Sequence, residues 1–247
     1  IKIEQLRNAQ HTTEKVMQIA CELIGNSIPS KDGSLQKNGL TITSEYVQHI
    51  IDIELLKSGY ENPGSIVAGG PQGADCHELG SGPLYTSQPV IIDIFPKNKK
   101  TLYNGDCTRT VVNGEIPNQI KKMHSAILEA KENAIKTIAP KVSGNEVHEK
   151  TIETLKKYGF NYGMRPEDAS PDWCGMVHGT GHGIGLEVHE PPSLGKGGGV
   201  LSVGDVITVE PGLYSQALGG IRIEDMVCVT DAGHENFNSL QESLDWK

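Results

Sequence analysis

Four stretches of the chain have the alternation of apolar and polar positions, or the boundary residues, that are typical of helices. They are residues 4–24, 44–57, 119–138 and 145–158. In the second stretch the apolar positions share one face, and Ser44 is placed to cap the first turn. Pro117 and Pro140 bracket the third stretch, because proline is tolerated at the start of a helix but not in its interior. We therefore expect four helices.

Four other stretches are short apolar runs that predict β-strands. They are residues 89–95, 107–112, 205–210 and 220–230. The segments 61–89 and 160–200 are rich in glycine, proline and polar residues, which indicates loops and short strands. The order of helix, strands, helices and strands predicts an α+β fold. No low-complexity linker divides the chain, so we interpret residues 1–247 as a single domain.

Acidic residues interrupt the apolar strands. Asp93 lies between isoleucines, Glu210 follows a valine, and Glu224 follows an isoleucine. A carboxylate on a strand that is buried on both faces must be hydrogen-bonded, paired with a cation or bound to a metal. One such acid alone is most simply a structural residue at a strand end. Three of them, with Asp106 close by, are hard to explain independently and favour a shared site.

The spacing of the acids is repeated along the chain, which we call the internal echo. Asp93 and Asp106 are thirteen positions apart, and Glu210 and Glu224 are fourteen positions apart. Each pair spans two expected strands and their connection, with one carboxylate on each strand. This arrangement predicts two related hairpins that face each other across one site.

Strand spacing places two further groups on the inner face. Arg222 and Glu224 are two positions apart in the expected strand 220–230, and so point to the same side. Two interpretations stay open: a local ion pair, or a cation that holds a ligand group and offsets the charge of the site. By the same spacing, Asp106 and Thr108 share a face.

A glycine-rich segment, HGTGHGIGLEVHEPP at residues 178–192, carries three histidines. His178, His182 and His189 lie within twelve residues of one another, and His77 precedes the Asp93 strand. The glycine spacing is not that of a dinucleotide-binding loop or a P-loop, and no HExxH motif is present. Glycine at these positions lets the backbone approach a metal or a substrate closely.

Composition restricts the class of partner. The chain has 22 basic and 31 acidic residues, a formal net charge of −9. An acidic protein is a poor match for nucleic acid or an anionic membrane. No apolar run approaches the ~20 residues that span a bilayer, and we find no signal peptide. We therefore expect a cytoplasmic protein that binds neither nucleic acid nor membrane.

The five cysteines do not form a disulfide or zinc pattern, because their number is odd and their spacing is wide. Free thiols in a reducing compartment are the simplest interpretation. Cys76 precedes His77 and resembles a nucleophile pair. Adjacent residues on a strand point to opposite faces, so we expect the two side chains to lie apart.

Four carboxylates that converge on one point cannot all stay ionised without offsetting positive charge. Two divalent metal ions, with Asp93, Asp106, His182, Glu210 and Glu224 as ligands, would supply it. An oxygen-rich set with one imidazole suits Mn²⁺ best, and Co²⁺, Fe²⁺ or Zn²⁺ could also bind. A pair of such ions activates water and clamps the attacked group. The predicted reaction class is metal-assisted hydrolysis.

The motifs VIIDIFP, GDCTRT, HGTGHGIGLEVHEPP, VITVEPG and GIRIEDMVCVT, in this order, resemble the pita-bread metallopeptidases. That family contains Xaa-Pro aminopeptidases, prolidases and methionine aminopeptidases, and the resemblance covers residues 1–231. It implies a curved antiparallel sheet of two pseudo-symmetric halves covered by helices. It also implies that Asp93 chelates one metal, that Asp106 and Glu224 bridge both, and that His182 and Glu210 hold the second.

The same resemblance implies roles around the metals. Glu210 would relay a proton from the bridging water, and His189 and His77 would bind the substrate and stabilise the tetrahedral intermediate. Arg222 and His178 favour the proline branch of the family, because methionine aminopeptidases usually lack that arginine. The implied activity is removal of the first residue from peptides with proline at the second position, by a protein that could form a homodimer.

Three alternatives remain beside this interpretation. A methionine aminopeptidase is the nearest enzyme, and Arg222 and His178 argue against it. A creatinase-like enzyme has the same fold without metal, but its ligand set is usually incomplete. A non-catalytic pita-bread binding protein would also lack ligands, whereas all five are present in this chain.

Two features depart from the family pattern. The spacing from Asp93 to Asp106 is wider than is usual, and the additional residues fall in the turn segment 96–105. Full-length Xaa-Pro enzymes usually carry an N-terminal domain that influences substrate length and oligomerisation. The chain begins with Ile1 rather than methionine, so we expect it to be the catalytic domain without that N-terminal domain.

Overall fold

The structure is a computed structural model that describes residues 2–247. Its four α-helices lie where the sequence predicts them: α1 (Lys2–Gly25), α2 (Ser44–Lys57), α3 (Asn118–Thr137) and α4 (Gly144–Lys157). One boundary prediction is wrong. The side chain of Thr43, not of Ser44, caps α2 by accepting a hydrogen bond from the Tyr46 backbone N–H, and Ser44 is the first helical residue.

The strands form three larger sheets. One has the order β5-β6-β8, the second β12-β11-β13-β16-β17 and the third β15-β14-β10-β9. Pairs within the first two sheets are antiparallel, and β9–β10 in the third is parallel. The bounds are β5 (Ser65–Gly69), β6 (Pro89–Ile94), β8 (Cys107–Val112), β9 (Asn161–Tyr162), β10 (Gly175–Met176), β11 (Gly181–Gly183), β12 (Glu190–Leu194), β13 (Val206–Val209), β14 (Gly212–Ser215), β15 (Gly219–Arg222), β16 (Asp225–Thr230) and β17 (Gly233–Asn236).

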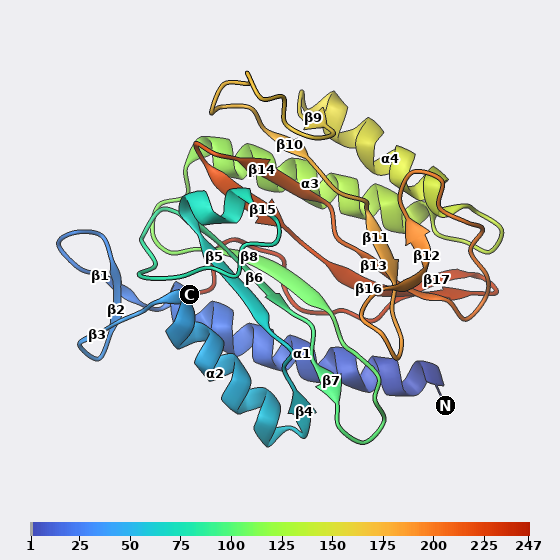
Figure 1. Cartoon of the computed structure of the whole chain (residues 1–247), viewed down its shortest axis with the longest axis horizontal. Coiled ribbons are helices and arrows are strands. Elements are labelled where there is room, and N and C mark those ends of the chain that lie inside the picture. Colours follow the sequence, from blue (N-terminus) through green and yellow to red (C-terminus); the bar gives the residue numbers. More distant parts are fainter. Residues whose placement is uncertain (1) are drawn as a thin grey trace.

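Two small elements complete the sheet structure. The strands β1 (Ile28–Pro29), β2 (Leu35–Lys37) and β3 (Leu40–Thr41) form a separate three-stranded sheet that projects beyond α2 in Figure 1. The strand β7 (Lys97–Asn98) pairs with β4 (Tyr60–Glu61). This ribbon accommodates the wide connection between Asp93 and Asp106, so β6 and β8 still pair in register from Pro89–Val112 to Ile94–Cys107.

The expectation of one strand over residues 220–230 is wrong. The chain forms β15 and β16 there, in two different sheets, and leaves Ile223 and Glu224 between them. The backbone N–H of Glu224 instead donates a hydrogen bond of 3.1 Å to the carbonyl of Thr108 in β8. The two sheets therefore meet at β8, and this junction carries Glu224 to the side of Asp106.

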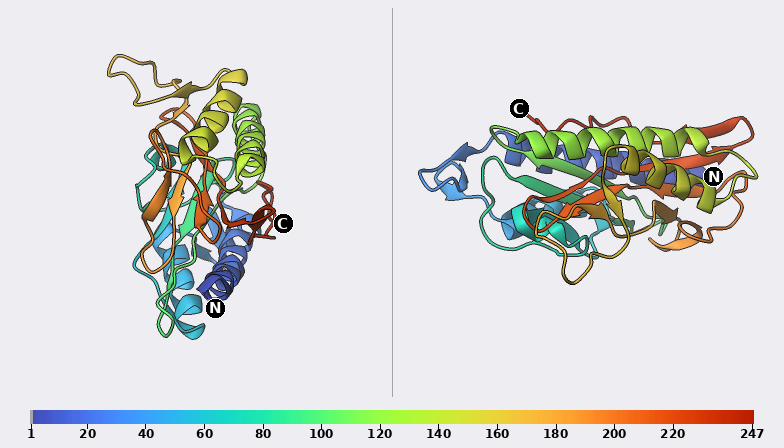
Figure 2. Two further views of the ribbon diagram at one scale, coloured as in Figure 1. Left: turned by 90° about the vertical axis from the view of Figure 1, so that its right-hand side faces the viewer. Right: turned by 90° about the horizontal axis from the view of Figure 1, so that it is seen from above.

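The helices cover the sheets in two pairs. Helix α1 packs against β8 and β6, and α2 packs against β5, whereas α3 lies along β13, β14 and β15, and α4 contacts β12. Figure 1 shows these pairs below and above the central strands, and Figure 2 shows α1 and α3 on the same side of the strand layer.

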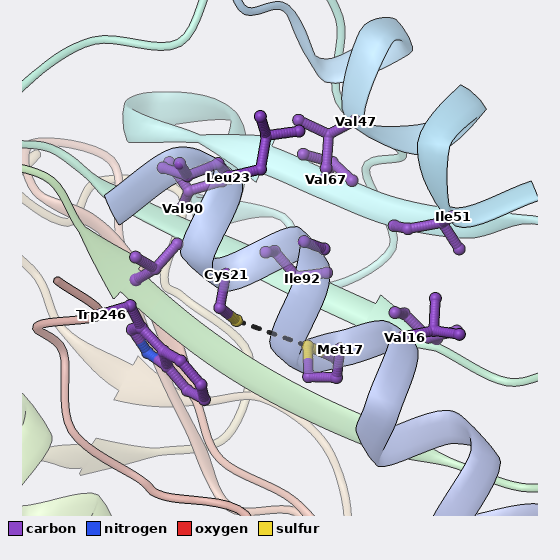
Figure 3. Close-up of a cluster of buried hydrophobic side chains, with 14 of the residues drawn as sticks. Val16, Met17, Cys21, Leu23, Val47, Ile51, Val67, Val90, Ile92 and Trp246 are labelled. Atoms are coloured by element: carbon purple, nitrogen blue, oxygen red, sulfur yellow. Dashed lines mark hydrogen bonds between the residues drawn. The ribbon is translucent and has the colours of Figure 1, made fainter. Parts of the chain in front are cut away.

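The largest hydrophobic cluster holds β6 and β8 against the first two helices. Met17 and Cys21 of α1, Ile51 of α2 and Ile92 of β6 are all fully buried, and Trp246 from the end of the chain closes the cluster (Figure 3). Burial of each such side chain contributes about 1.5–3 kcal/mol. Strand β6, which carries Asp93, is thus fixed from its outer face.

Within residues 2–247, no helix combines the length and the apolar character needed to cross a membrane.

Candidate metal centre

A cavity of about 570 Å³ opens between the β5-β6-β8 sheet and the β11–β13 strands. All nine residues that the sequence analysis selected line it: His77, Asp93, Asp106, His178, His182, His189, Glu210, Arg222 and Glu224. They come from at least five separate segments of the chain. The fold therefore brings every candidate to one place, and the geometry within the cavity decides what each can do.

The four acids come from two pairs of neighbouring antiparallel strands. Asp93 lies in β6 and Asp106 immediately precedes β8, the partner of β6. Glu210 immediately follows β13 and Glu224 immediately precedes β16, and the register pairs Val209 with Asp225. Each pair of antiparallel strands therefore places two carboxylates near one end. The sequence predicted two hairpins with one acid on each strand, whereas only Asp93 lies within a strand, and β14 and β15 of another sheet separate β13 from β16.

The most compact group contains Asp106, His182 and Glu224. One ligand atom from each lies within 4.8 Å of the other two. His182 Nε2 is 3.3 Å from Glu210 Oε1 and 3.8 Å from Asp106 Oδ2. Oxygen and imidazole donors at these separations can share one divalent cation.

His182 is held with its Nε2 toward the acids. Its Nδ1–H donates to the backbone carbonyl of Gly183 at 3.1 Å, and its backbone N–H donates to Thr208 Oγ1 at 3.0 Å. A carbonyl on Nδ1 fixes the tautomer in which Nε2 carries a lone pair, the form that binds a metal. Thr208 also donates to Glu210 Oε1 at 3.2 Å.

Glycine in this segment serves strand packing. A Cβ on Gly181 would lie 1.9 Å from the carbonyl oxygen of Thr208. The close approach at this position is therefore between β11 and β13. Gly179 and Gly181 also line the cavity, so the expected approach to a metal or substrate stays a prediction. The consequence of the strand contact for the site is indirect, because it sets how near His182 lies to Glu210.

Three of the four acids are disfavoured as anions in this cavity. Burial raises the pKa of Asp93, and Arg222 opposes this shift only in part. Burial raises the pKa of Asp106 well above its usual value, and the charges of Glu224, Asp93 and Glu210 raise it further. Burial also raises the pKa of Glu224, together with the charges of Glu210 and Asp93. Thr108 Oγ1 donates to Glu224 Oε2 at 2.7 Å and opposes this shift only in part. The site lacks positive charge for its number of acids.

Glu210 and His182 behave as an ion pair. Burial opposes the ionised carboxylate, but the hydrogen bond from His182 and the nearby positive charges outweigh it and lower the pKa of Glu210 to about 2. Burial lowers the pKa of His182, and the contact with Glu210 reverses this, so its pKa is raised. Burial lowers the pKa of His178. Without a metal, His182 is therefore the imidazole that is charged beside the acids, and a bound metal would take the place of the proton on its Nε2.

Arg222 pairs with Asp93. Its Nη2 donates to Asp93 Oδ2 at 2.6 Å across the sheet junction, so the interpretation of a local pair with Glu224 is not the one the structure adopts. Asp93 Oδ1 is buried and has no hydrogen-bond partner among residues 2–247. A buried carboxylate oxygen without a partner is costly, and it is a free ligand atom at the cavity wall.

Tyr214 links two of the predicted residues and was missed in the sequence. Its hydroxyl donates to His178 Nε2 at 2.7 Å and accepts from Arg222 Nη1 at 3.0 Å. His178 Nδ1–H donates to the Gly179 carbonyl at 2.7 Å. Tyr214 lies in β14 within the apolar run 211–214, and its only sequence signal was a hydroxyl that must find a partner when buried.

Two histidines lie toward the mouth of the cavity. The His189 ring packs edge-on against His182, with ring centroids 4.2 Å apart, and burial lowers its pKa. His77 is exposed and follows the 3₁₀ helix η1 (Gly70–Ala74) in a turn rather than a strand. The expectation that Cys76 and His77 point apart is therefore wrong, because Cys76 Sγ lies 3.8 Å from His77 Nδ1.

The donor set fits divalent metal. The cavity holds an unpartnered carboxylate oxygen on Asp93, acids with raised pKa values, and a histidine with Nε2 aimed at them. Each of these features is what a bound cation would resolve, by accepting the lone pairs and by offsetting the negative charge.

Comparison with known proteins supports the same conclusion. A family profile described as metallopeptidase family M24 matches residues 4–231. The chain belongs to metallopeptidase family M24. Among curated relatives, it is 28% identical over 99% of its length to an Xaa-Pro dipeptidase of Pyrococcus furiosus. Family M24 implies bound divalent metal ions, and the resemblance inferred from the motifs is confirmed.

Solved structures of the family share the fold. The prolidase of Pyrococcus horikoshii OT3 matches 98% of the chain with a TM-score of 0.82 and 27% identity. An X-Pro aminopeptidase of Thermotoga maritima matches 98% with a TM-score of 0.80 and 28% identity. The predicted α+β class is confirmed. The chain spans 65% of the Pyrococcus furiosus relative and 63% and 62% of these two structures.

Proposed function

We propose that residues 1–247 form the catalytic domain of a dinuclear-metal exopeptidase that removes the first residue from Xaa-Pro peptides, as an Xaa-Pro aminopeptidase or dipeptidase. The observation that carries this proposal is the cluster of four acids around His182, of which Asp106 and Glu224 are buried and Asp93 has one unpartnered carboxylate oxygen. The similarity to proteins named Xaa-Pro dipeptidase and prolidase supports the substrate class.

The metal ligands in this proposal are Asp93, Asp106, His182, Glu210 and Glu224. Arg222 occupies one oxygen of Asp93 and leaves Oδ1 for a metal. When bound, divalent ions would polarise the scissile carbonyl and activate water at neutral pH. Mn²⁺ matches the oxygen-rich donor set best, and Co²⁺, Zn²⁺ and Fe²⁺ are alternatives.

Glu210 is proposed to act as the proton acceptor as well as a ligand. Its carboxylate lines the cavity beside His182, a position from which it could accept a proton from the attacking water and return it to the leaving amine. Thr208 and His182 both contact its Oε1. This support keeps the base oriented without protonating it.

The histidines around the cluster are proposed to contact substrate. His189 lies against His182, and its lowered pKa keeps the ring neutral, so its N–H can donate to the oxyanion of a tetrahedral intermediate. His77 lies across the mouth of the same cavity. His178 already has both ring nitrogens engaged, by Gly179 and Tyr214, so it serves as a fixed wall for the proline ring.

The proline preference has a chemical reason. An Xaa-Pro bond has no N–H donor and carries a rigid ring, so a site selects it by shape rather than by a hydrogen bond to the scissile nitrogen. The apolar lining of the cavity includes Ile66, Phe95 and Val188. Together with the edge of His178, these side chains offer such a surface.

Several finer features belong to the same proposal. The two carboxylate pairs support a pseudo-symmetric arrangement of two halves. Five free thiols support a reducing, cytoplasmic location. A homodimer is a further part of the proposal, and the chain spans only about two thirds of the length of these relatives.

The test is a substrate comparison on protein reloaded with Mn²⁺, Co²⁺ or Zn²⁺. We expect about two ions per chain and a higher kcat/KM for Ala-Pro peptides than for matched Ala-Ala or Met-Ala peptides. Dipeptides and longer Xaa-Pro peptides are compared in the same assay. A preference for Met-Ala peptides that His178→Ala does not change would assign the chain to the methionine aminopeptidases, and absence of bound metal would refute the metal centre.

A further inference from the structure

A second group of metal-binding side chains lies at the mouth of the cavity. Asp75, Cys76 and His77 follow η1, and one carboxylate oxygen, the thiol sulfur and one imidazole nitrogen lie within 4.8 Å of one another. Cys76 and His77 line the cavity that holds the four acids. None of the three is required as a ligand of the metal centre proposed above.

We propose that Asp75, Cys76 and His77 form a separate site for a thiophilic divalent cation of the zinc class, and that occupation of this site inhibits the peptidase. Three different donors, sulfur, nitrogen and oxygen, with a fourth position open to water, are a combination that suits Zn²⁺ or Cd²⁺. Mn²⁺, which favours oxygen ligands, would bind the acid cluster instead.

The distances suit a tetrahedral ion. Bonds of about 2.3 Å to sulfur and about 2.0 Å to nitrogen, at tetrahedral angles, separate the two ligand atoms by about 3.5 Å. Cys76 Sγ and His77 Nδ1 are 3.8 Å apart. This separation is close to the tetrahedral value, and a carboxylate oxygen of Asp75 lies within 4.8 Å of both atoms.

The three side chains make few other hydrogen bonds within the described residues. Within residues 2–247, Cys76 Sγ has His77 Nδ1 as its sole hydrogen-bonding contact, and the Asp75 carboxylate only accepts from the His77 backbone N–H at 2.9 Å. A thiolate and a carboxylate also neutralise a divalent ion, so the complete site carries no net charge when His77 is neutral.

The site is anchored to the acid cluster through the backbone. Arg222 Nη1 donates to the Cys76 carbonyl at 3.4 Å, and the same guanidinium pairs with Asp93. The Cys76 side chain packs against a small core that includes Ile66 and Tyr214. The thiol is therefore presented at a fixed place beside the substrate cavity.

Inhibition follows from the part that His77 is proposed to play. An ion on its Nδ1 would hold the imidazole toward Cys76 and Asp75, and would place an ion with its bound water at the cavity mouth. Inhibition by the ion rests on the proposed peptidase function, whereas binding of the ion at this site is independent of that function.

Cadmium provides a direct probe, because a thiolate bound to Cd²⁺ absorbs in the near ultraviolet and oxygen or imidazole ligands do not. We would titrate the Mn²⁺-loaded protein with Cd²⁺ and follow this band. We expect a saturable band of one equivalent that is lost in Cys76→Ser and retained in Cys228→Ala, a control at a buried cysteine. Asp75→Asn should keep the band and weaken the affinity at least ~10-fold.

Activity measured in the same titration separates the two claims. Each variant is compared with its own activity before Cd²⁺ is added, and the half-inhibiting concentration should rise at least ~10-fold in Cys76→Ser. No saturable band, or a band that persists in Cys76→Ser, overturns the site even if the chain is an active peptidase. A band that depends on Cys76 in a chain without peptidase activity keeps the site and rejects the function. An active chain with that band but without inhibition rejects the link through His77.

Discussion

Glu224 and Asp225 are adjacent in the sequence, and both are buried, yet the fold treats their charges in opposite ways. Burial and the charges of Glu210 and Asp93 raise the pKa of Glu224 well above its usual value. Burial has the same effect on Asp225, but Lys131 and Arg109 outweigh it and lower the pKa. One carboxylate lacks a cation, and its neighbour is fully paired.

The contrast follows from the directions in which the two side chains point. Glu224 lies at the sheet junction and faces the cavity. Asp225, the first residue of β16, faces α3, where it pairs with Lys131, and β8, where Arg109 Nη2 donates to it at 3.0 Å. Asn236 of β17 donates to its second oxygen at 2.8 Å. We call the group of Glu224, Asp93, Asp106 and Glu210 the open cluster. We call Asp225 with its partners Lys131, Arg109 and Asn236 the Asp225 cluster.

The difference separates a structural use of buried charge from a functional one. The Asp225 cluster is complete without any ligand, and its parts hold α3, β8 and β16 together. The open cluster has four acids with His182 and Arg222 as the cations near them, so its charge is balanced only when something else binds. A buried acid whose pKa is raised beside other acids is thus the better indicator of a site.

The largest effect should come from Glu210→Gln in the open cluster. The substitution keeps the shape of the side chain but removes the proton acceptor and weakens a metal ligand. We expect kcat with Xaa-Pro peptides to fall by about 10²–10⁴-fold. The melting temperature of the metal-free protein should fall only as far as loss of the ion pair with His182 requires. Steady-state kinetics and thermal denaturation measure the two quantities, and a variant with near-normal kcat would show that the role is misassigned.

In the Asp225 cluster, Asp225→Asn should damage stability. It leaves the fully buried guanidinium of Arg109 and the ammonium of Lys131 without their shared anion. We expect the free energy of unfolding to fall by about 3–5 kcal/mol, measured by denaturant titration. Glu235→Gln is the matched control, because its ion pair with Arg7 is partly exposed and should contribute less than about 1 kcal/mol. Equal losses in both variants would remove the distinction.

The equivalent change in the open cluster, Glu224→Gln, should act in the other direction. Without metal, the free energy of unfolding should stay constant or rise by on the order of 1 kcal/mol, because an acid in an anion-rich, buried place is replaced by a neutral group. With saturating Mn²⁺ the wild type should be the more stable protein, since the variant has lost a ligand. A large loss of stability in the metal-free variant would place Glu224 with the structural acids.

The smallest effect concerns pH. The pKa values of Asp106 and Glu224 are raised in the folded protein, so their stabilising contribution is present at pH values below the unfolded pKa and is lost as pH rises through the folded pKa. The Asp225 pKa is lowered, so its contribution is present above the unfolded pKa and is lost as pH falls through the folded pKa. Metal-free protein should therefore gain stability from Glu224 as the pH falls from the raised folded pKa toward the unfolded value of about 4.3.

His178 and His148 oppose this trend, because burial lowers the pKa of each and protonation below about pH 6.5 then favours the unfolded chain. The informative measurement is the difference in unfolding free energy between wild type and Glu224→Gln, with a chelator present, at a series of pH values. We expect the wild type to improve relative to the variant as the pH falls. A constant difference would mean that Glu224 does not titrate in this range.

Much of the architecture could be predicted from local sequence. The four helices and the strands β6, β8 and β13 lie within two residues of the predicted bounds, because apolar periodicity and proline or glycine boundaries act over a few residues. The nine candidate residues also share one cavity, as the motifs predicted. An acid buried in an apolar strand is energetically costly and therefore unusual, so it can be recognised from the sequence alone.

Other features depend on contacts between distant segments. The break between β15 and β16 arises because Glu224 bonds to Thr108, which lies 116 positions earlier, and no pattern within residues 220–230 reports that partner. For the same reason, sequence spacing could not assign Arg222 to Asp93, or Lys131 and Arg109 to Asp225. Sequence spacing also predicted wrongly that the Cys76 and His77 side chains point apart, because these residues lie in a turn after η1 and not in a strand.

The sequence by itself thus determined which residue types would be buried and which chemistry they offer: acids, an imidazole and an arginine on apolar strands. Only the tertiary structure decided which of those acids receives a cation from the protein and which is left open. The physical reason is that burial is encoded in local periodicity, whereas charge pairing depends on the few ångströms between side chains brought together by sheet pairing. That is why Glu224 and Asp225, neighbours in the chain, have different environments in the fold.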